Sequence, residues 1–331
     1  MGKNIIVSGM RPTGKLHLGN YFGALVNWIR LQEEEDCLFF VADWHALTTG
    51  YEEPSEIPEN IQNLVLDWIS AGLDPEKCCI FLQSDIKQHA ELHLAFSLIT
   101  PLSWLTRCPT YKDQLDQLGD RDIRTYGFLG YPCLQAADIL LYKADGVPVG
   151  EDQLPHLEIT REIARRFNFL FQCSLFPEPK SILNEAKVLP GIDGRKMSKS
   201  YQNEIALSDS LEEVRGKVMR MVTDPSRIRK DDPGHPDICS VFSMYKVIAP
   251  DLTEEIKDSC SGGKTGCVAC KRKLGERLCA LMAPIAERRQ DLVKKPGQVR
   301  EILQNGSQTA RARAEQTMES VKHAMKLKLP D

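Results

Sequence analysis

The first half of the chain alternates short, unbroken apolar runs with stretches of helical periodicity, and this alternation limits the fold more than any other feature. The apolar runs lie at residues 4–8, 37–42, 78–83 and, more briefly, 145–150. Helical spacing occupies residues 18–31, 55–71, 89–100, 131–143 and 151–167. Strands that are apolar throughout are buried on both faces, and helical connections make neighbouring strands parallel. The pattern therefore predicts an α/β fold, a Rossmann-like doubly wound parallel sheet with helices on both faces.

Strand-like runs stop after about residue 207, and helical spacing continues at residues 210–222, 270–290, 296–303 and 308–327. A chain of 331 residues fits two domains. We predict an α/β domain at residues 1–205 and a smaller all-helical domain at residues 206–331. The longest apolar run, Leu278–Ala286, has nine residues and includes Pro284, whereas a membrane-spanning helix needs about 20. The N-terminus has no signal-peptide core, so we expect no membrane contact.

The segment that follows the first predicted strand, GMRPTGKL at residues 9–16, is close to a phosphate-binding P-loop. A P-loop-type nucleotide-binding NTPase is therefore one interpretation, with Asp43 after the second strand as its metal-binding carboxylate. The P-loop needs Ser or Thr, which holds Mg²⁺, at the position that Leu16 occupies here. Leucine cannot bind a metal ion, so the P-loop interpretation is strongly disfavoured.

A second interpretation uses the next four residues, HLGN at 17–20, which begin a predicted helix. Backbone N–H groups and the helix dipole favour phosphate at such a position. His17 and Asn20 point the same way as donors, and Gly19 lets a base or ribose approach the backbone. Capping the helix is the commoner role of such residues, so this motif is weak by itself.

A lysine-rich segment, KMSKS at residues 196–200, strengthens the second interpretation. Two ammonium groups with interleaved hydroxyls suit a polyphosphate. The pair HLGN and KMSKS resembles the two signatures of class I aminoacyl-tRNA synthetases, in their usual order. The resemblance implies that both segments act on the α–β phosphate bond of ATP, which binds with Mg²⁺. It also implies that the lysines stabilise the leaving pyrophosphate. The catalytic residues that we predict are His17, Asn20, Lys196 and Lys199.

The stretch from Tyr131 to Arg165, with Asp43-Trp44-His45, closely resembles tryptophanyl-tRNA synthetases. Asp138 lies on an apolar helix face, where an unpaired carboxylate would cost several kcal/mol, and the resemblance places the indole N–H on it. The resemblance assigns L-tryptophan binding to Asp138, Tyr131, Gln135, His45, Val147, Val149 and Gln153. It assigns ATP binding to Arg11, Pro12, Thr13, Gly19, Asn20, Gly150, Glu151, Asp152, Val188, Lys196, Met197, Ser198, Lys199 and Ser200.

The same resemblance implies the reaction and the partners. Tryptophan and ATP would give tryptophanyl-adenylate and pyrophosphate, and the amino acid would pass to the terminal ribose of tRNA(Trp). In-line transfer of this kind needs positioning and charge stabilisation more than acid–base chemistry. We further expect a cytoplasmic homodimer, as the resemblance implies. Residues 206–331 would bind the tRNA anticodon.

Four of the eleven cysteines gather in 32 residues, at Cys239, Cys260, Cys267 and Cys270. Four thiolates suit tetrahedral zinc or an iron–sulfur cluster, and their spacing does not separate the two; unligated thiols are the third alternative. The closing Gly-Cys-x-x-Cys-Lys resembles a branch of bacterial tryptophanyl-tRNA synthetases that carries a [4Fe–4S] cluster. We therefore expect [4Fe–4S], with zinc as second choice, in a structural or RNA-positioning role.

The net charge of −4 by itself disfavours a nucleic-acid partner. The charge is unevenly distributed, however, because residues 260–331 hold 15 Lys and Arg against 7 Asp and Glu. The sequence thus predicts an RNA-backbone contact surface on the helical domain. Its clusters lie at residues 271–273, 288–289, 294–295 and 311–313.

Overall fold

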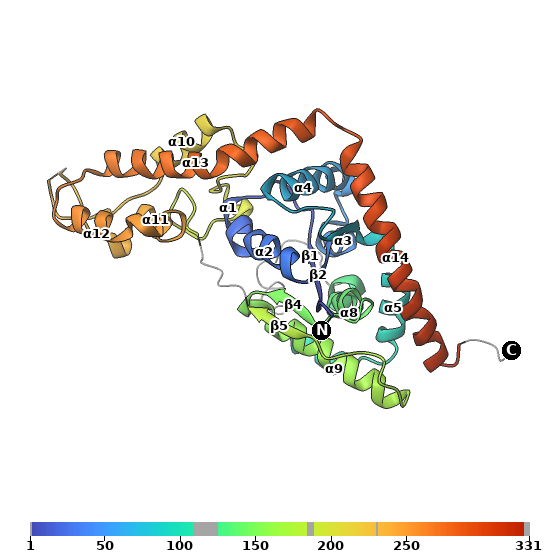
Figure 1. Ribbon diagram of the computed structural model, residues 1–331. Coiled ribbons are helices and arrows are strands. Elements are labelled where there is room, and N and C mark those ends of the chain that lie inside the picture. Colours follow the sequence, from blue (N-terminus) through green and yellow to red (C-terminus); the bar gives the residue numbers. More distant parts are fainter. Residues whose placement is uncertain (1, 109–110, 112–124, 184–188, 230, 328–331) are drawn as a thin grey trace.

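The computed structural model describes residues 2–108, 111, 125–183, 189–229 and 231–327 (Figure 1). Its centre is a five-stranded parallel sheet with strand order β3-β2-β1-β4-β5. The strands are β1 (Ile5–Met10), β2 (Asp36–Val41), β3 (Cys79–Leu82), β4 (Gly146–Val149) and β5 (Lys180–Leu183). The predicted parallel sheet is confirmed. The sequence analysis missed β5, because its four residues are half-exposed and give no apolar run.

Both faces of the sheet are buried, as the apolar strands predict. In β2, Cys37 and Phe39 belong to one apolar core, whereas Leu38 and Phe40 belong to a second core on the opposite face. Helices α2 (Val26–Glu34) and α4 (Ile57–Ala71) cover the first face, where Trp28 stacks on Phe39 at 4.5 Å between ring centroids. Helices α5 (Gln88–Ser97), α8 (Tyr126–Leu140) and α9 (Leu154–Leu170) cover the second. The sheet is therefore doubly wound.

Shorter helices connect these layers. Helix α1 (Leu18–Asn20) continues through a π-helical turn at Tyr21–Leu25 into α2, so residues 18–34 form one helix. Two more α-helices lie in the described residues of the α/β part, α3 (Asp43–Gly50) and α6 (Leu102–Thr106). Among the described residues no strand follows β5, and the helices there are α10 (Leu211–Arg220), α11 (Ser240–Ile248), α12 (Thr253–Ser261), α13 (Cys267–Val293) and α14 (Gln298–Ala324).

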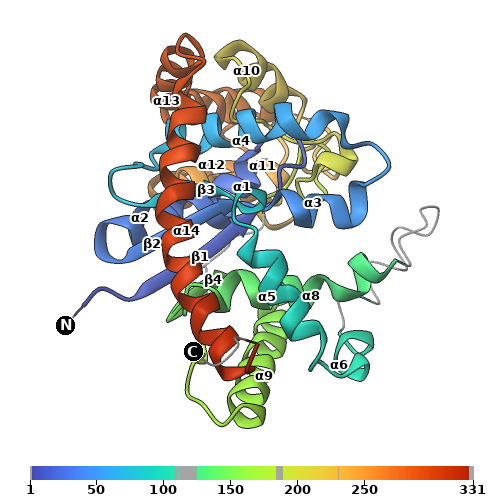
Figure 2. The ribbon, with the colours of Figure 1, turned by 90° about the vertical axis from the view of Figure 1, so that its right-hand side faces the viewer.

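The C-terminal helices do not form a core of their own. Val214 and Val218 of α10 and Leu278 of α13 join the core on the first face of the sheet. Helix α14 then runs back along β3 and α5 (Figures 1 and 2), where Ala314 and Met318 join the second core. The two helices predicted at residues 296–303 and 308–327 are one helix, so the predicted break was wrong. No helix in the described part of the chain is both long and apolar enough to span a membrane.

Candidate active site

A cleft of about 270 Å³ opens at the carboxyl ends of β1 and β4. The strand order reverses between these two strands, which is where open α/β sheets bind ligands. The volume is near the lower end of small-molecule sites, ~300 Å³. All seven residues that the sequence analysis assigns to tryptophan line this cleft, namely His45, Tyr131, Gln135, Asp138, Val147, Val149 and Gln153. Arg11 and Asp152 of the ATP set line it too.

Asp138 lies on α8 at the base of the cleft and is only 1% exposed. Its Oδ2 lies 2.8 Å from His45 Nε2, and its Oδ1 lies 2.7 Å from Gln83 Nε2 and 2.6 Å from His89 Nδ1. Burial alone would raise the pKa of Asp138, but the hydrogen bonds from His45 and His89 outweigh it and lower the pKa to about 2. The buried group is thus a carboxylate acceptor at neutral pH.

Several residues of the cleft carry no sequence signal and were missed. Phe40, Phe128 and His156 all line it. The His156 ring nitrogen Nε2 is hydrogen bonded to the Tyr131 hydroxyl. Burial lowers the pKa of His156 to about 4, so the ring is neutral at pH 7. Residue 156 lies on the next helix, so only its contact with Tyr131 in the folded structure shows that His156 belongs to the cleft.

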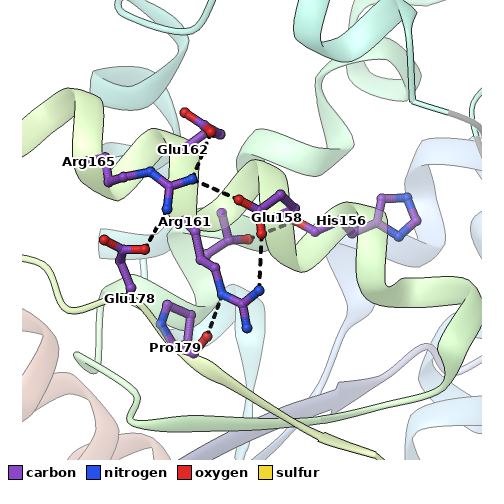
Figure 3. Close-up of polar contacts among 8 residues, drawn as sticks. His156, Glu158, Arg161, Glu162, Arg165, Glu178 and Pro179 are labelled. Carbon is purple, nitrogen blue, oxygen red and sulfur yellow. Dashed lines mark hydrogen bonds and ion pairs between the residues drawn. The ribbon is translucent and has the colours of Figure 1, made fainter.

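Helix α9 carries His156 at one end of a network of charged residues (Figure 3). Arg165 contacts Glu158, Glu162 and Glu178, and Arg161 donates to the carbonyl oxygen of Pro179 at 2.8 Å. Glu178 and Pro179 directly precede β5, so these contacts tie that edge strand to α9. The ring of His156 projects away from this network.

The HLGN segment forms a reciprocal cap at the start of α1. Asn20 N donates to His17 Nδ1 at 3.3 Å, and His17 N donates to Asn20 Oδ1 at 3.1 Å. Burial, with Lys199 nearby, lowers the pKa of His17 to about 4. The neutral ring accepts at Nδ1 and therefore carries its proton on Nε2, where it can donate to a ligand. Capping and donation are compatible, because they use different nitrogens.

Gly19 is needed for this cap. A Cβ at that position would lie 2.9 Å from two atoms of the His17 ring. The glycine thus leaves room for the histidine, a reason that the sequence analysis did not give.

The KMSKS segment lies against the loop that precedes HLGN. Lys199 Nζ donates to the carbonyl oxygens of Thr13 and Gly14 at 3.1 Å each. The backbone just after KMSKS pairs with the HLGN segment, since Leu18 N donates to Ile205 O at 3.0 Å and Leu207 N donates to Leu16 O at 2.8 Å. Two segments almost 190 residues apart in sequence therefore form one unit.

Asn203 orders the KMSKS loop and was missed by the sequence analysis. Its Nδ2 donates to Asp193 Oδ1 at 2.7 Å and to Lys196 O at 3.2 Å, and its Oδ1 accepts from Ser198 N at 2.8 Å. Gly191 must be glycine, because a Cβ there would lie 2.3 Å from the Asn203 side chain. No local motif marks either residue.

The other residues of the predicted ATP set are spread around these loops. Lys196 and Ser200 are exposed, and Met197 is buried. Pro12 is buried, Thr13 is exposed, and Gly150 precedes the short 3₁₀ turn Glu151–Gln153. Val188 lies outside the described residues.

The P-loop alternative is not favoured by the position of Leu16. Its side chain is 1% exposed and belongs to the core on the first sheet face. Asp43, the proposed metal-binding carboxylate, is buried and accepts from Ser84 N at 3.0 Å. Neither side chain is placed to share a metal ion with a bound phosphate.

The four clustered cysteines line one pocket together with Asp224 and Arg227. Three lie at helix N-termini, with Cys239 just before α11 and Cys267 and Cys270 in the first turn of α13. Arg227 Nη1 lies 3.8 Å from Cys260 Sγ and 4.0 Å from Cys267 Sγ. Nowhere in the described chain are three His, Cys, Asp or Glu side chains arranged to hold a metal ion.

Burial and the neighbouring thiols raise the pKa of Cys270 to about 12. Helix N-termini and the guanidinium of Arg227 act in the opposite direction and favour thiolates. Burial also raises the pKa of Cys260, although Arg227 acts in the opposite direction.

The basic residues of the C-terminal region are less open than the sequence suggested. Several of them form ion pairs with acidic residues of the same chain, and three of these acidic partners lie in the α/β part. The pairs are Arg289–Asp67, Arg313–Asp36, Lys322–Glu91, Lys273–Glu255 and Arg277–Asp251. Arg289, Arg313 and Lys322 therefore join the two parts of the chain.

Comparison with known proteins agrees with this geometry. The family model of class I tRNA synthetases (W and Y) matches residues 1–283. The tryptophan–tRNA ligases of Thermotoga maritima and Aquifex aeolicus are 50% and 47% identical to the chain, each over 97% of the chain and 99% of the relative. Tryptophanyl-tRNA synthetase from Campylobacter jejuni, complexed with ADP and tryptophan, gives a TM-score of 0.87 at 33% identity, over 97% of this chain and 99% of that chain. The chain therefore belongs to the class I tRNA synthetases, within their tryptophan–tRNA ligase group.

Proposed function

We propose that the cleft and the two signature segments carry out both steps of tryptophan–tRNA ligation. The tryptophan carboxylate attacks the α-phosphate of ATP, the α–β bond breaks, and pyrophosphate leaves. The terminal ribose hydroxyl of tRNA(Trp) then attacks the carbonyl carbon, and AMP leaves with the bonding electrons. The observation that carries the proposal is the pairing of the HLGN and KMSKS segments beside a cleft lined by all seven predicted tryptophan residues.

In this proposal the indole enters the cleft against Phe40 and Phe128 and donates its N–H to Asp138. An acceptor fixed in a buried site rejects analogues that lack the donor, by up to about 10⁴–10⁵-fold. Tyr131, Gln135, His45 and Gln153 hold the amino and carboxylate groups. Val147 and Val149 of β4 pack against the ring.

ATP binds across the start of α1, where backbone N–H groups and His17 Nε2 face its phosphates. Asn20 adds its amide, and Arg11, Pro12 and Thr13 form the near wall. Lys196 and Lys199 neutralise the charge that develops on pyrophosphate, with Met197, Ser198 and Ser200 completing the loop. Mg²⁺ arrives with ATP. Gly150, Glu151, Asp152 and Val188 contact the ribose in this proposal.

Tryptophan-dependent exchange of pyrophosphate into ATP tests the first step. We expect exchange with tryptophan, and exchange with tyrosine at a small fraction of that rate. Lys199→Ala should lower exchange by about 10²–10³-fold, the usual loss for one transition-state donor. Equal exchange in the variant and the parent protein would remove Lys199 from the mechanism.

We also propose that Cys239, Cys260, Cys267 and Cys270 hold a [4Fe–4S] cluster, with zinc as second choice. A four-iron cluster binds each thiolate to a different iron, so it does not need three ligands round one ion. Arg227 beside two of the thiols would offset the cluster's negative charge. Metal analysis and the visible spectrum of protein purified without oxygen test this. Stoichiometric zinc in a colourless protein would exclude the cluster.

Residues 206–331 form the anticodon-binding domain in this proposal. The Cys₄ pocket would support its surface. Salt-dependent binding of tRNA(Trp) by the Arg272→Glu variant tests it, because Arg272 is exposed on α13. A lost phosphate contact should weaken binding and reduce its dependence on salt.

A homodimer is supported by exposed apolar side chains on one side of the α/β part. Leu94 and Leu98 on and just after α5, Leu102 of α6 and Tyr126 of α8 are 61–71% exposed, and Figure 2 shows these helices on the same side of the molecule. Leu98→Glu should give a monomer in analytical ultracentrifugation. Phe169→Glu is the control, since Phe169 is 82% exposed on α9.

The free thiols described in the chain fit the reducing cytoplasm where tRNA is charged.

A further inference from the structure

Asp138 is held by two side chains that do not themselves line the cleft. Gln83 follows β3 and His89 lies in the first turn of α5, and both are 0% exposed. Both reach the same carboxylate oxygen, Oδ1, at 2.7 Å and 2.6 Å. The other oxygen, Oδ2, contacts His45, which does line the cleft.

Counting acceptor sites shows what these contacts leave available. An ionised carboxylate offers about two acceptor sites on each oxygen. Gln83 and His89 occupy both sites on Oδ1, and His45 occupies one of the two on Oδ2. No other side chain in the described part of the chain is seen to donate to Asp138, so one site remains, on the oxygen beside the cleft. An indole N–H is only a donor, and it fits this remaining site.

Tyr142 determines which nitrogen of His89 carries the proton. Its hydroxyl lies 2.8 Å from His89 Nε2 and is buried with the rest of the side chain. The hydroxyl keeps its proton, because burial raises the pKa of Tyr142 well above its ordinary value. It donates to Nε2, and Nδ1 then carries the proton that faces Asp138. The rings of Phe40, Phe81 and Tyr142, with centroids 5.5–6.1 Å away, hold the imidazole in place.

We propose that His89 is a positioning residue for tryptophan recognition. Together with Gln83 it fills Oδ1 of Asp138 and so directs the one open acceptor site on Oδ2 toward the indole N–H. This inference rests on the proposed role of Asp138 as the indole acceptor. Selectivity for a ring N–H therefore depends on a residue that never touches the substrate.

The test compares tryptophan with its analogue in which sulfur replaces the ring N–H, by kcat/KM in pyrophosphate exchange. His89→Phe keeps an aromatic ring among Phe40, Phe81 and Tyr142 but removes the donor. We expect its KM for tryptophan to rise about 10- to 100-fold, as for losing a hydrogen bond to a charged group. The preference for tryptophan over the analogue should fall by the same factor, with the KM for ATP unchanged. His89→Asn should restore most of the preference, because its amide nitrogen occupies the position of Nδ1.

Further variants separate the inference from the proposal on which it rests. Asp138→Asn should abolish the preference, and a preserved preference would overturn the role of Asp138 itself. If Asp138→Asn loses the preference but His89→Phe keeps it, only the role of His89 is overturned. If His89→Phe does not fold, Gln83→Met removes the other donor to Oδ1 at nearly constant volume. An unchanged preference in Gln83→Met would then overturn the inference.

Discussion

Lys199 shows how far the surroundings change the chemistry of a residue that the sequence identifies. Burial lowers the pKa of its ammonium group to about 8, although Asp67 and Glu204 act in the opposite direction. The KMSKS pattern predicts a lysine beside phosphate, but it gives no information on this burial. The pKa depends on the loop of Thr13 and Gly14, which lies against Nζ.

The pH dependence of ATP use should therefore report Lys199. The charged form stabilises pyrophosphate, and it is lost as pH rises through about 8, so kcat/KM for ATP should fall above that pH. The fall in kcat should occur at higher pH, because bound phosphates favour the ammonium form. Pyrophosphate exchange between pH 6.5 and 9.5, about 1.5 units on each side of this pKa, measures both. Lys199→Arg is the control, since arginine stays charged. A fall near pH 8 that persists in Lys199→Arg would assign it to another group.

At the same scale, the sequence predicted side chains but not what holds them. Asp138, His17 and Lys199 belong to motifs with a chemical rationale. Asn203 and His89 do not. Asn203 orders its own loop through contacts with residues 193–198, and His89 acts through Asp138 on another helix. Period and spacing describe one segment at a time, and such partners therefore appear only in the folded chain.

Helix α14 is the clearest difference between prediction and structure at the scale of elements. The spacing predicts two helices, at residues 296–303 and 308–327, yet one helix continues from Gln298 to Ala324. Glycine is needed at position 306 because α14 packs closely across the edge strand β3. A Cβ at Gly306 would lie 1.8 Å from the carbonyl oxygen of Ile80. The glycine allows close packing and does not end the helix.

Gly306→Ala should destabilise the protein, although glycine to alanine usually stabilises a helix by up to about 1 kcal/mol. The obstacle is backbone, so α14 must move away from β3, and overpacking of this kind costs about 1–3 kcal/mol. Gly216→Ala in α10 is the matched control, because nothing lies within 4 Å of its Cβ. Urea unfolding curves of the two variants should shift in opposite directions. A stabilised Gly306→Ala would mean that α14 does not pack so closely.

The alternation of strands and helices predicted the architecture of the α/β part correctly, because each buried strand shows an apolar run. The sequence analysis missed β5, which has only four residues, and α3, whose residues are mixed in polarity. The return of α14 to the sheet also could not be predicted. Apolar spacing shows that a helix has a buried face, but it does not show which surface covers that face.

At the scale of the whole molecule, the end of α13 lies beside α4 (Figure 1) and joins the C-terminal region to the segment before HLGN. Arg289 Nε donates to Asp67 Oδ1 on α4 at 2.8 Å, and Arg288 Nε donates to Ser70 O at 2.7 Å. Asp67, 1% exposed, also accepts from Leu16 N at 3.4 Å. Charges that the sequence analysis counted toward RNA binding thus hold the segment before HLGN.

Arg289→Met should be strongly destabilising at neutral pH, because it leaves Asp67 buried and unpaired, a loss of about 3–5 kcal/mol. Burial already raises the pKa of Asp67 in spite of Arg289, and removing the arginine raises it further. The carboxylate is then neutralised as pH falls, so the stability deficit of the variant should shrink between pH 7 and about pH 5, in the acid range of a raised carboxyl pKa. Arg277→Met on the same helix is the control, since its pair with Asp251 is exposed and contributes less than about 1 kcal/mol. Denaturant unfolding of both variants at the two pH values measures the difference, and a deficit independent of pH would show that Asp67 is not the group left unpaired.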